Sequence, residues 1–315
     1  LVILLVLLHS TVLYAIDNPL LKLVPHDSLF FTGNTQLIPI NDYPMMDFSS
    51  SFEPPLGQSE RQDLGKELSF FYEFFLDFEQ MVSHGNQAIQ KHYGLPDQVA
   101  AVAYTVGATP VIKMHLQDEQ AFLDILDRAE KKSGFSHTMS SYQGINYRNY
   151  TLDGQHDFIV HIQAQDSGIK VATLALMSKT LPEQSRKLIL GLSLPGQSIA
   201  DTGKVAAIEK QQQYLPVSVS FLDFEQLVKS LFQEKDNPWV ALCGDEDKTF
   251  AELQASECEA DVLAIASDMP RMLAGYKNYQ VKGQRINMDF ELLLELKNQN
   301  VKTELNQFRG FIPDY

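Results

Sequence analysis

The feature that most limits the possible folds of this 315-residue chain is a series of short strand-like segments joined by tight turns. Residues 99–106 and 111–116 flank the turn Gly107-Ala108-Thr109-Pro110. Residues 158–164 place apolar side chains at every second position, and a short turn leads from them into residues 169–177. Turns of this length reverse the chain, since a parallel pair needs a crossover of about a dozen residues or more. The sequence therefore predicts antiparallel sheets.

Amphipathic helices separate these hairpins. Residues 67–92 repeat aromatic side chains at helical spacing, which predicts a helix with one core-facing side. Asp118 and Gly134 are suited to the start and the end of a second helix, because aspartate caps free amide groups and glycine adopts the left-handed conformation that ends helices. We therefore expect the α+β class, with antiparallel sheets and helices packed on one face.

The order of these elements repeats along the chain, which predicts two tandem related units. Residues 111–129 resemble residues 291–310 in pattern, at an offset of 291 − 111 = 180. The hexapeptide Phe-Leu-Asp-Phe-Glu-Gln also occurs twice, at 75–80 and 221–226, but its offset is 221 − 75 = 146. The offsets of 180 and 146 cannot both align the two units unless one unit has a large insertion. We therefore rely on the order of the elements, and not on the hexapeptide, to define the repeat.

These patterns suggest three parts. We expect a signal peptide at 1–15, a first α+β unit at 16–213 with a long mobile loop at 33–66, and a second α+β unit at 214–315. The second unit stops where the first continues with further strands, so we expect it to be truncated at its C-terminus. The loop is rich in Gly, Pro, Ser, Asn and Asp, and a segment of this length without regular structure is uncommon inside a compact domain.

The first residues indicate export. Eight apolar residues precede His9, and Ala15 lies where signal peptides are cleaved. The basic start of such a peptide is missing, so the segment is expected to be incomplete. An uncleaved anchor and a buried core segment are the alternatives. We expect the periplasm of a Gram-negative bacterium, with no membrane span in the mature chain.

The charge balance excludes two classes of partner. The chain has 40 acidic and 25 basic residues, a formal charge of −15. Affinity for nucleic acid comes mostly from Lys and Arg that neutralise phosphates, so we expect no nucleic-acid partner. The same balance disfavours docking on an anionic membrane.

Cys243 and Cys258 are the chain's two cysteines, 258 − 243 = 15 positions apart. In an oxidising compartment this spacing predicts a disulfide that closes a local loop. Two free buried thiols are the alternative. The acidic residues around this loop lack the spacing of a calcium-binding loop, and a solvated acidic face is the preferred interpretation.

One segment predicts a possible binding surface. Tyr142, Tyr147, Arg148 and Tyr150 lie close together in the sequence, and exposed tyrosines offer contact area with a polar tip for a carbohydrate or peptide. The alternative interpretation is cross-strand packing on a twisted sheet.

Three segments of the chain have recognisable patterns: Val-Pro-His-Asp-Ser-Leu-Phe-Phe at 24–31, Tyr-Gln-Gly-Ile-Asn-Tyr-Arg-Asn-Tyr at 142–150, and residues 214–231. With these segments the chain resembles a family of uncharacterised exported bacterial proteins with tandem α+β units. The resemblance covers about residues 20 to 310 and implies export and tandem units. It implies no activity and no site.

No local motif for catalysis occurs. The sequence has no HExxH, no G-x-S-x-G and no glycine-rich phosphate loop, so we assign no catalytic, cofactor or metal residue. His161 could approach His115 across a sheet. We expect a non-catalytic exported protein that binds an envelope partner or ligand. The alternative is an envelope hydrolase whose catalytic residues converge only in the fold, which a polar pocket with perturbed acidity would favour.

Overall fold

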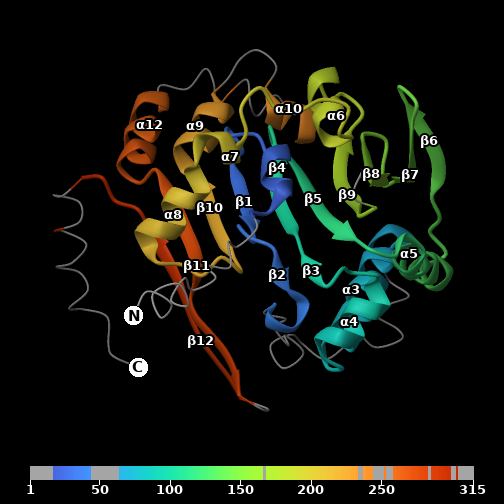
Figure 1. The fold of residues 1–315 in the computed structure, drawn as a ribbon. Helices are drawn as coiled ribbons and strands as arrows, with labels where there is room; N and C mark the ends of the chain where they lie inside the picture. The colour runs from blue at the N-terminus through green and yellow to red at the C-terminus, as the bar shows by residue number, and fades with distance from the viewer. Residues whose placement is uncertain are drawn as a thin grey trace, which may run out of the picture.

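One antiparallel sheet of ten strands runs through the described part of the chain (Figure 1). The computed structural model describes residues 17–43, 64–165, 168–232, 237–243, 252, 258–282, 285–298 and 303. The strand order is β12-β11-β10-β1-β4-β5-β9-β8-β7-β6. The strands are β1 (Phe30–Gly33), β4 (Ala101–Val106), β5 (Thr109–Leu116), β6 (Thr138–Tyr142), β7 (Ile145–Thr151), β8 (His156–Ala164), β9 (Lys170–Ser178), β10 (Val219–Asp223), β11 (Arg271–Lys282) and β12 (Arg285–Leu294). The predicted α+β class and the antiparallel pairing are confirmed.

The two predicted units share this sheet. β1 of the first unit pairs with β10 of the second, and Thr32 lies opposite Ser220. The Ser220 hydroxyl donates a hydrogen bond of 2.7 Å to the Thr32 hydroxyl. The boundary at residues 213 and 214 remains a prediction.

The helices lie on both faces of the sheet, which corrects the expectation of one face. Neighbouring residues of a strand point to opposite faces, and Ile159 and Val160 of β8 belong to two different hydrophobic clusters. The face that packs on α3, α4 and α5 is here called the α3 face, and the opposite one the α8 face. The helices are η1 (Pro19–Leu23), η2 (Ile40–Asp42), α3 (Lys66–Val82), α4 (Asn86–Tyr93), α5 (Glu119–Ser133), α6 (Glu183–Ile189), α7 (Ile199–Thr202), α8 (Lys204–Gln212), α9 (Phe224–Leu231), α10 (Pro238–Cys243) and α12 (Glu259–Asp268).

The α3 face is built around Phe70. This side chain is buried, and its ring centroid lies 4.8 Å from that of Tyr150 on β7. The single helix expected at 67–92 is two helices, because the chain turns at Gly85, whose φ of 85° is strained for other residues. Asp118 and Gly134 cap α5 as predicted, with the Asp118 side chain accepting from two backbone amides.

The front of the expected mobile loop is ordered. Ile38 and Pro39 form β2, which pairs with β3 (Gln98–Val99) in a small second sheet. η2 follows directly. Residues 44–63 and the expected signal peptide lie outside the described residues.

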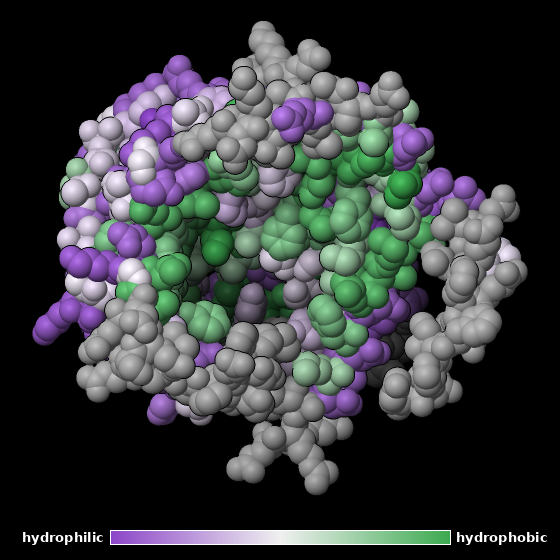
Figure 2. Space-filling view, turned by 180° about the vertical axis from the view of Figure 1, so that it is seen from behind, coloured by the Kyte–Doolittle hydropathy of each residue, from purple (hydrophilic) through white to green (hydrophobic). Residues whose placement is uncertain are grey.

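Among the described residues, α3, α4 and α5 cover only one half of the α3 face. Seen from behind, the molecule has a hollowed surface that is largely hydrophobic (Figure 2). The large apolar side chains that are exposed on this face belong to β1, β5 and β12: Phe30, Ile112, Phe290, Leu292 and Leu294. Among the described residues, no helix is long and apolar enough to cross a membrane.

Candidate binding sites

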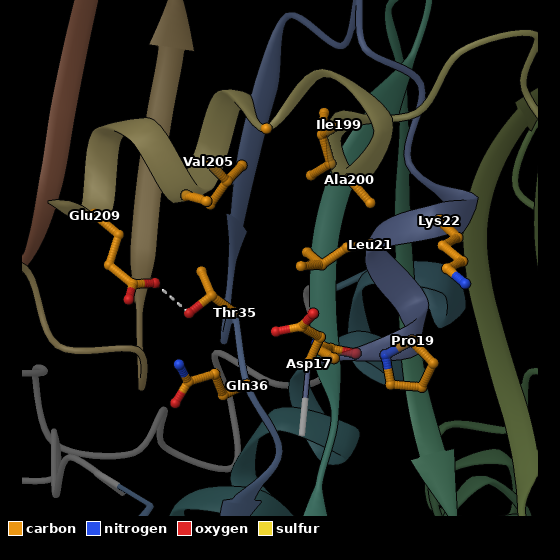
Figure 3. Close-up of a pocket in the computed structure, with 13 residues that line it drawn as sticks. Asp17, Pro19, Leu21, Lys22, Thr35, Gln36, Ile199, Ala200, Val205 and Glu209 are labelled. Atoms are coloured by element: carbon orange, nitrogen blue, oxygen red, sulfur yellow. Dashed lines mark hydrogen bonds between the residues drawn. The ribbon is translucent and has the colours of Figure 1, made fainter. Parts of the chain in front are cut away.

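A cavity of about 470 Å³ opens on the α8 face, between η1, the segment after β1, and the helices α7 and α8 (Figure 3). Its size falls in the range of pockets for small ligands. The residues that line it are Asp17, Asn18, Pro19, Leu21, Lys22, Thr35, Gln36, Ile199, Ala200, Gly203, Val205, Ala206 and Glu209. We call this cavity the α8 pocket.

Two buried asparagines fix one wall of the α8 pocket. The Asn18 side chain donates to the Asn34 carbonyl at 2.8 Å and accepts from the Leu20 amide at 3.0 Å, which starts η1. The Asn34 side chain donates to the Val99 carbonyl and accepts from the Ala101 amide, both at 2.8 Å. Because buried polar groups are costly to leave unpaired, these bonds hold η1 against the end of β1.

A capping box and a glycine fix the opposite wall. The Ser198 hydroxyl accepts from the Asp201 amide, and the Asp201 carboxylate accepts from the Ser198 amide, so α7 begins at Ile199. Gly203, with a φ of 64°, redirects the chain into α8. Ile199 and Val205 are thereby anchored in the core, beside the pocket.

One end of the α8 pocket is acidic. The Thr35 hydroxyl donates a hydrogen bond to the Glu209 carboxylate. Burial raises the pKa of Glu209 above its usual value, the Thr35 bond opposes this, and the Asp17 carboxylate raises the pKa further. Gln36 lies beside them, and its backbone pairs with that of Asp17 (Figure 3). The pocket therefore holds a carboxyl group, that of Glu209, whose ionisation is disfavoured by its burial and by a neighbouring carboxylate.

The lysine that lines this pocket does not neutralise the pair. The Lys22 side chain points away from Glu209 (Figure 3). In the part of the chain that the structure describes, neither Glu209 nor Asp17 forms an ion pair with a basic side chain. The other end of the pocket is apolar, with Leu21, Ile199 and Ala200 (Figure 3). The site thus combines an acidic end with an apolar one.

The four residues of the expected binding surface do not share an exposed face. Tyr150 is 0% exposed in the cluster of the α3 face, where its hydroxyl donates to Glu130 at 2.8 Å. Tyr147 is buried in the cluster of the α8 face, and Tyr142 packs against the same cluster. Arg148 forms an ion pair with Asp127 of α5. The cross-strand packing alternative describes these residues better than a platform.

The predicted disulfide is absent from the structure. Cys243 ends α10 and Cys258 precedes α12, and both are unpaired and exposed. The cysteines are free, as the alternative interpretation expected, but they are exposed and not buried.

His115 and His161 are both buried on the α8 face, but β9 lies between their strands, β5 and β8. His161 lies opposite Thr173, and Thr173 lies opposite Lys113. The Lys113 ammonium donates to the Thr173 hydroxyl at 2.9 Å and to the Ile189 carbonyl at 2.8 Å. Lys113 therefore anchors the end of α6. Among the described residues, no group of His, Cys, Asp and Glu is arranged to hold a metal ion.

Sequence reasoning missed the α8 pocket. Thr35 and Glu209 are 174 positions apart, and no motif links them. The helices α7 and α8, which border the pocket, were not among the elements expected from the sequence.

No family model and no curated protein matches this chain. A crystal structure of the bacterial protein TP0453, "Structure of crystal form I of TP0453", is similar at a TM-score of 0.36 and 10% identity. That match covers 93% of this chain and 86% of TP0453.

Proposed function

We propose that this protein is an exported, non-catalytic binding protein, and that its α8 pocket binds a small organic cation: an ammonium group on an apolar body. One observation carries the proposal. The half-buried Glu209 carboxylate lies beside Asp17 at one end of a pocket whose other end is apolar. An ammonium group has three donors and no acceptor, so it complements these two carboxyl groups.

The acid–base behaviour of Glu209 gives this binding a characteristic pH dependence. Burial raises the pKa of Glu209, which means that its surroundings in the protein disfavour its charged form. A bound cation favours that charged form. Affinity for the amine should therefore fall as the pH drops through the raised pKa, and binding near that pKa should release a proton.

Calorimetric titration with matched ligands tests the proposal. The probes are primary amines from butylamine to 2-phenylethylamine, each paired with the alcohol of the same skeleton. We expect at least one amine to bind at least tenfold more tightly than its alcohol. If the alcohols bind as well as the amines, or no amine binds, the proposal is wrong.

Glu209→Gln identifies the group responsible. A hydrogen bond to a charged partner contributes about 1.5–3 kcal/mol, so the variant should lose roughly tenfold or more in amine affinity. The affinity for the alcohols should not change. Glu259→Gln is the matched control, since Glu259 is exposed on α12 and does not line the pocket. Equal amine affinity in Glu209→Gln and wild type would show that Glu209 does not bind the ammonium group.

Export to the periplasm is the second part of the proposal, supported by the apolar segment that ends at Ala15. Alkaline phosphatase folds only in the oxidising periplasm and so reports on export. With a Met and a basic start added before residue 1, we expect a C-terminal fusion to be active, and the same fusion without residues 1–15 to be inactive. Inactivity of the fusion that keeps residues 1–15 would contradict export.

A hydrolase is the second candidate, because a carboxyl group with a raised pKa beside another carboxylate suits general-acid catalysis of glycoside hydrolysis. Chromogenic glycosides test it. Turnover that Glu209→Gln abolishes would replace the binding proposal with this one.

A further inference from the structure

A second cavity, of about 280 Å³, lies between α9, α12 and the end of β12. The two helices lie side by side at one end of the sheet (Figure 1). We call this cavity the α12 pocket. We propose that it binds the hydrocarbon chain of a fatty acid, and that Lys297 and Lys229 hold the carboxylate. The proposal is independent of the α8 pocket, which lies on the opposite face of the sheet.

Every side chain that lines the α12 pocket is apolar. The lining residues are Phe224, Val228, Val262, Ile265, Ala266, Met269 and Leu294. A polar group placed among these side chains would lose its hydrogen bonds to water and gain none from them in return. The pocket therefore selects a hydrocarbon group.

The lining residues run from the protein interior to the surface. Ala266 is buried, whereas Ile265 is 56% exposed and Leu294 is 41% exposed. A hydrocarbon in the pocket would remove the surface of these side chains from water, which is favourable. The pocket is therefore accessible from solvent and gains stability when it is filled.

The volume of the pocket limits the length of the hydrocarbon. Benzene, with six carbon atoms, fills an apolar cavity of about 150 Å³, which is about 25 Å³ for each carbon. At that ratio, a pocket of about 280 Å³ holds about eleven carbons. This size fits the single chain of a fatty acid of medium length, and it is too small for a lipid with two long chains.

Two backbone hydrogen bonds place charged residues at one end of the pocket. The Glu225 amide, at the start of α9, donates to the Pro270 carbonyl at 3.2 Å. The Lys297 amide donates to the Asp268 carbonyl at 2.9 Å. Pro270 and Asp268 are the chain neighbours of Met269, which lines the pocket. Glu225 and Lys297 therefore lie at the Met269 end.

The lysines at this end have hydrogen-bond donors to spare. The Glu225 carboxylate accepts from Lys229 at 2.8 Å and from Lys297 at 3.3 Å. An ammonium group has three donors, and both lysine side chains are about half exposed, so each can also donate to a ligand carboxylate. The Asp268 carboxylate accepts from the Asn298 side chain at 3.2 Å, and no ion pair of the described residues joins it to either lysine. These donors favour an anionic head group.

The single tryptophan of the chain lies near the opposite end of the pocket. The Trp239 indole nitrogen donates to the Ser230 hydroxyl at 2.7 Å. Ser230 lies near the end of α9, shortly after the lining residue Val228, whereas Phe224 begins that helix. A fatty acid with its carboxylate at Lys297 therefore points its far end toward Trp239.

Calorimetric titration of the 315-residue chain with saturated fatty acids of increasing length tests the proposal. Burial of one methylene contributes about 0.8 kcal/mol, so the affinity should rise about fourfold for each carbon from hexanoate to decanoate. It should then level off, because the pocket is full at about eleven carbons. Adsorption on an open apolar surface has no such limit. Affinity that keeps rising to tetradecanoate, or no binding of any fatty acid, overturns the proposal.

Two alanines of α12 locate the site. Ala266→Phe fills the pocket, so the affinity for decanoate should fall at least tenfold. Ala264→Phe is the matched control, since Ala264 is exposed on the same helix and does not line the pocket. Equal affinity in the two variants overturns the proposal.

A brominated fatty acid keeps the test valid if Ala266→Phe fails to fold. Bromine quenches tryptophan fluorescence at short range. We expect 10-bromodecanoate to quench Trp239 in the wild type, and an excess of decanoate to restore the fluorescence. Binding without quenching would place the fatty acid elsewhere and would contradict the proposal.

Decanol tests the role of the carboxylate. Decanoate should bind the wild type more tightly than decanol does. Replacing Lys229 and Lys297 together by glutamine should weaken decanoate at least threefold and leave decanol unchanged. Equal affinities of the wild type for the two ligands would refute a fatty acid as the ligand. Glu209→Gln, in the α8 pocket, should bind decanoate as the wild type does, so a failure of either proposal is distinguishable from a failure of the other.

Discussion

The two halves of the sheet have the same order of strands, a central strand followed by a hairpin, but they differ in what covers them. In the first half, α3, α4 and α5 cover the α3 face, and β9 covers the edge of β5. In the second half, the same face exposes Phe290 and Leu292, and the described residues place no strand on the edge of β12. The comparison separates two groups of apolar side chains on the α3 face: those of the first half are buried and stabilise the fold, whereas Phe290 and Leu292 of the second half are exposed in the described structure.

The largest expected effect lies in the covered half. Phe70 is buried between α3 and the sheet, in contact with the rings of Tyr150 and Phe158. Phe70→Ala removes these contacts and leaves a cavity, so we expect the free energy of unfolding to fall by about 3–5 kcal/mol. Urea denaturation measures it. A loss below about 1 kcal/mol would mean that α3 packs loosely and that the two halves do not differ as described.

A pH-dependent effect comes next, from the buried lysine of the covered half. Burial lowers the pKa of Lys113 to about 8, against 10.5 for a free lysine. Between these values the unfolded chain binds more protons than the folded one, so stability rises with pH. Relative to Lys113→Met, the wild type should gain about 3 kcal/mol from pH 7 to pH 11.

Chemical denaturation of both proteins across this pH range measures the gain. Comparison of the two isolates Lys113 from the other titrating groups. A constant difference in stability would show that Lys113 keeps an ordinary pKa and is open to water. The core of the first half would then admit water at Lys113, and the contrast between the halves would weaken.

A much smaller effect is expected in the open half. Leu292→Ala removes a side chain that is largely exposed, so the free energy of unfolding should change by less than about 0.5 kcal/mol. Measured beside Phe70→Ala, it gives the contrast between the halves directly. A loss of about 2 kcal/mol or more would show that the open face is covered in solution.

The smallest effect concerns the cysteines. Cys243 and Cys258 are both exposed and unpaired, so both thiols should react with a thiol reagent in the folded protein. Replacing both by serine should leave the unfolding midpoint within about one degree, since surface substitutions change stability little. Thiols that become reactive only after reduction would restore the disulfide prediction.

Sequence reasoning succeeded where the signal is local. The hairpin around residues 107–110 and the caps of α5 follow from a few adjacent residues, and both are found. The antiparallel α+β class follows from the same turns. The break at Gly85 was overlooked because apolar residues recur at helical spacing on both sides of it, at Phe78 and Val82 before it and at Ile89 and Tyr93 after it.

Two further features were missed although the sequence carried a signal. Residues 171–177 are almost continuously apolar or small, which is typical of a strand buried on both faces and would have predicted helices on both. Strand alternation alone already places Tyr147 and Tyr150 on opposite faces. The α8 pocket carried no such signal, because Thr35 and Glu209 meet only through the fold.

The most direct test of the proposed function is a crystal structure of the chain with the tightest-binding amine of the panel. The account predicts the ammonium nitrogen within hydrogen-bond distance of the Glu209 carboxylate and the apolar body beside Leu21 and Ile199. An amine bound elsewhere, or an α8 pocket that stays empty under saturating amine, would contradict it.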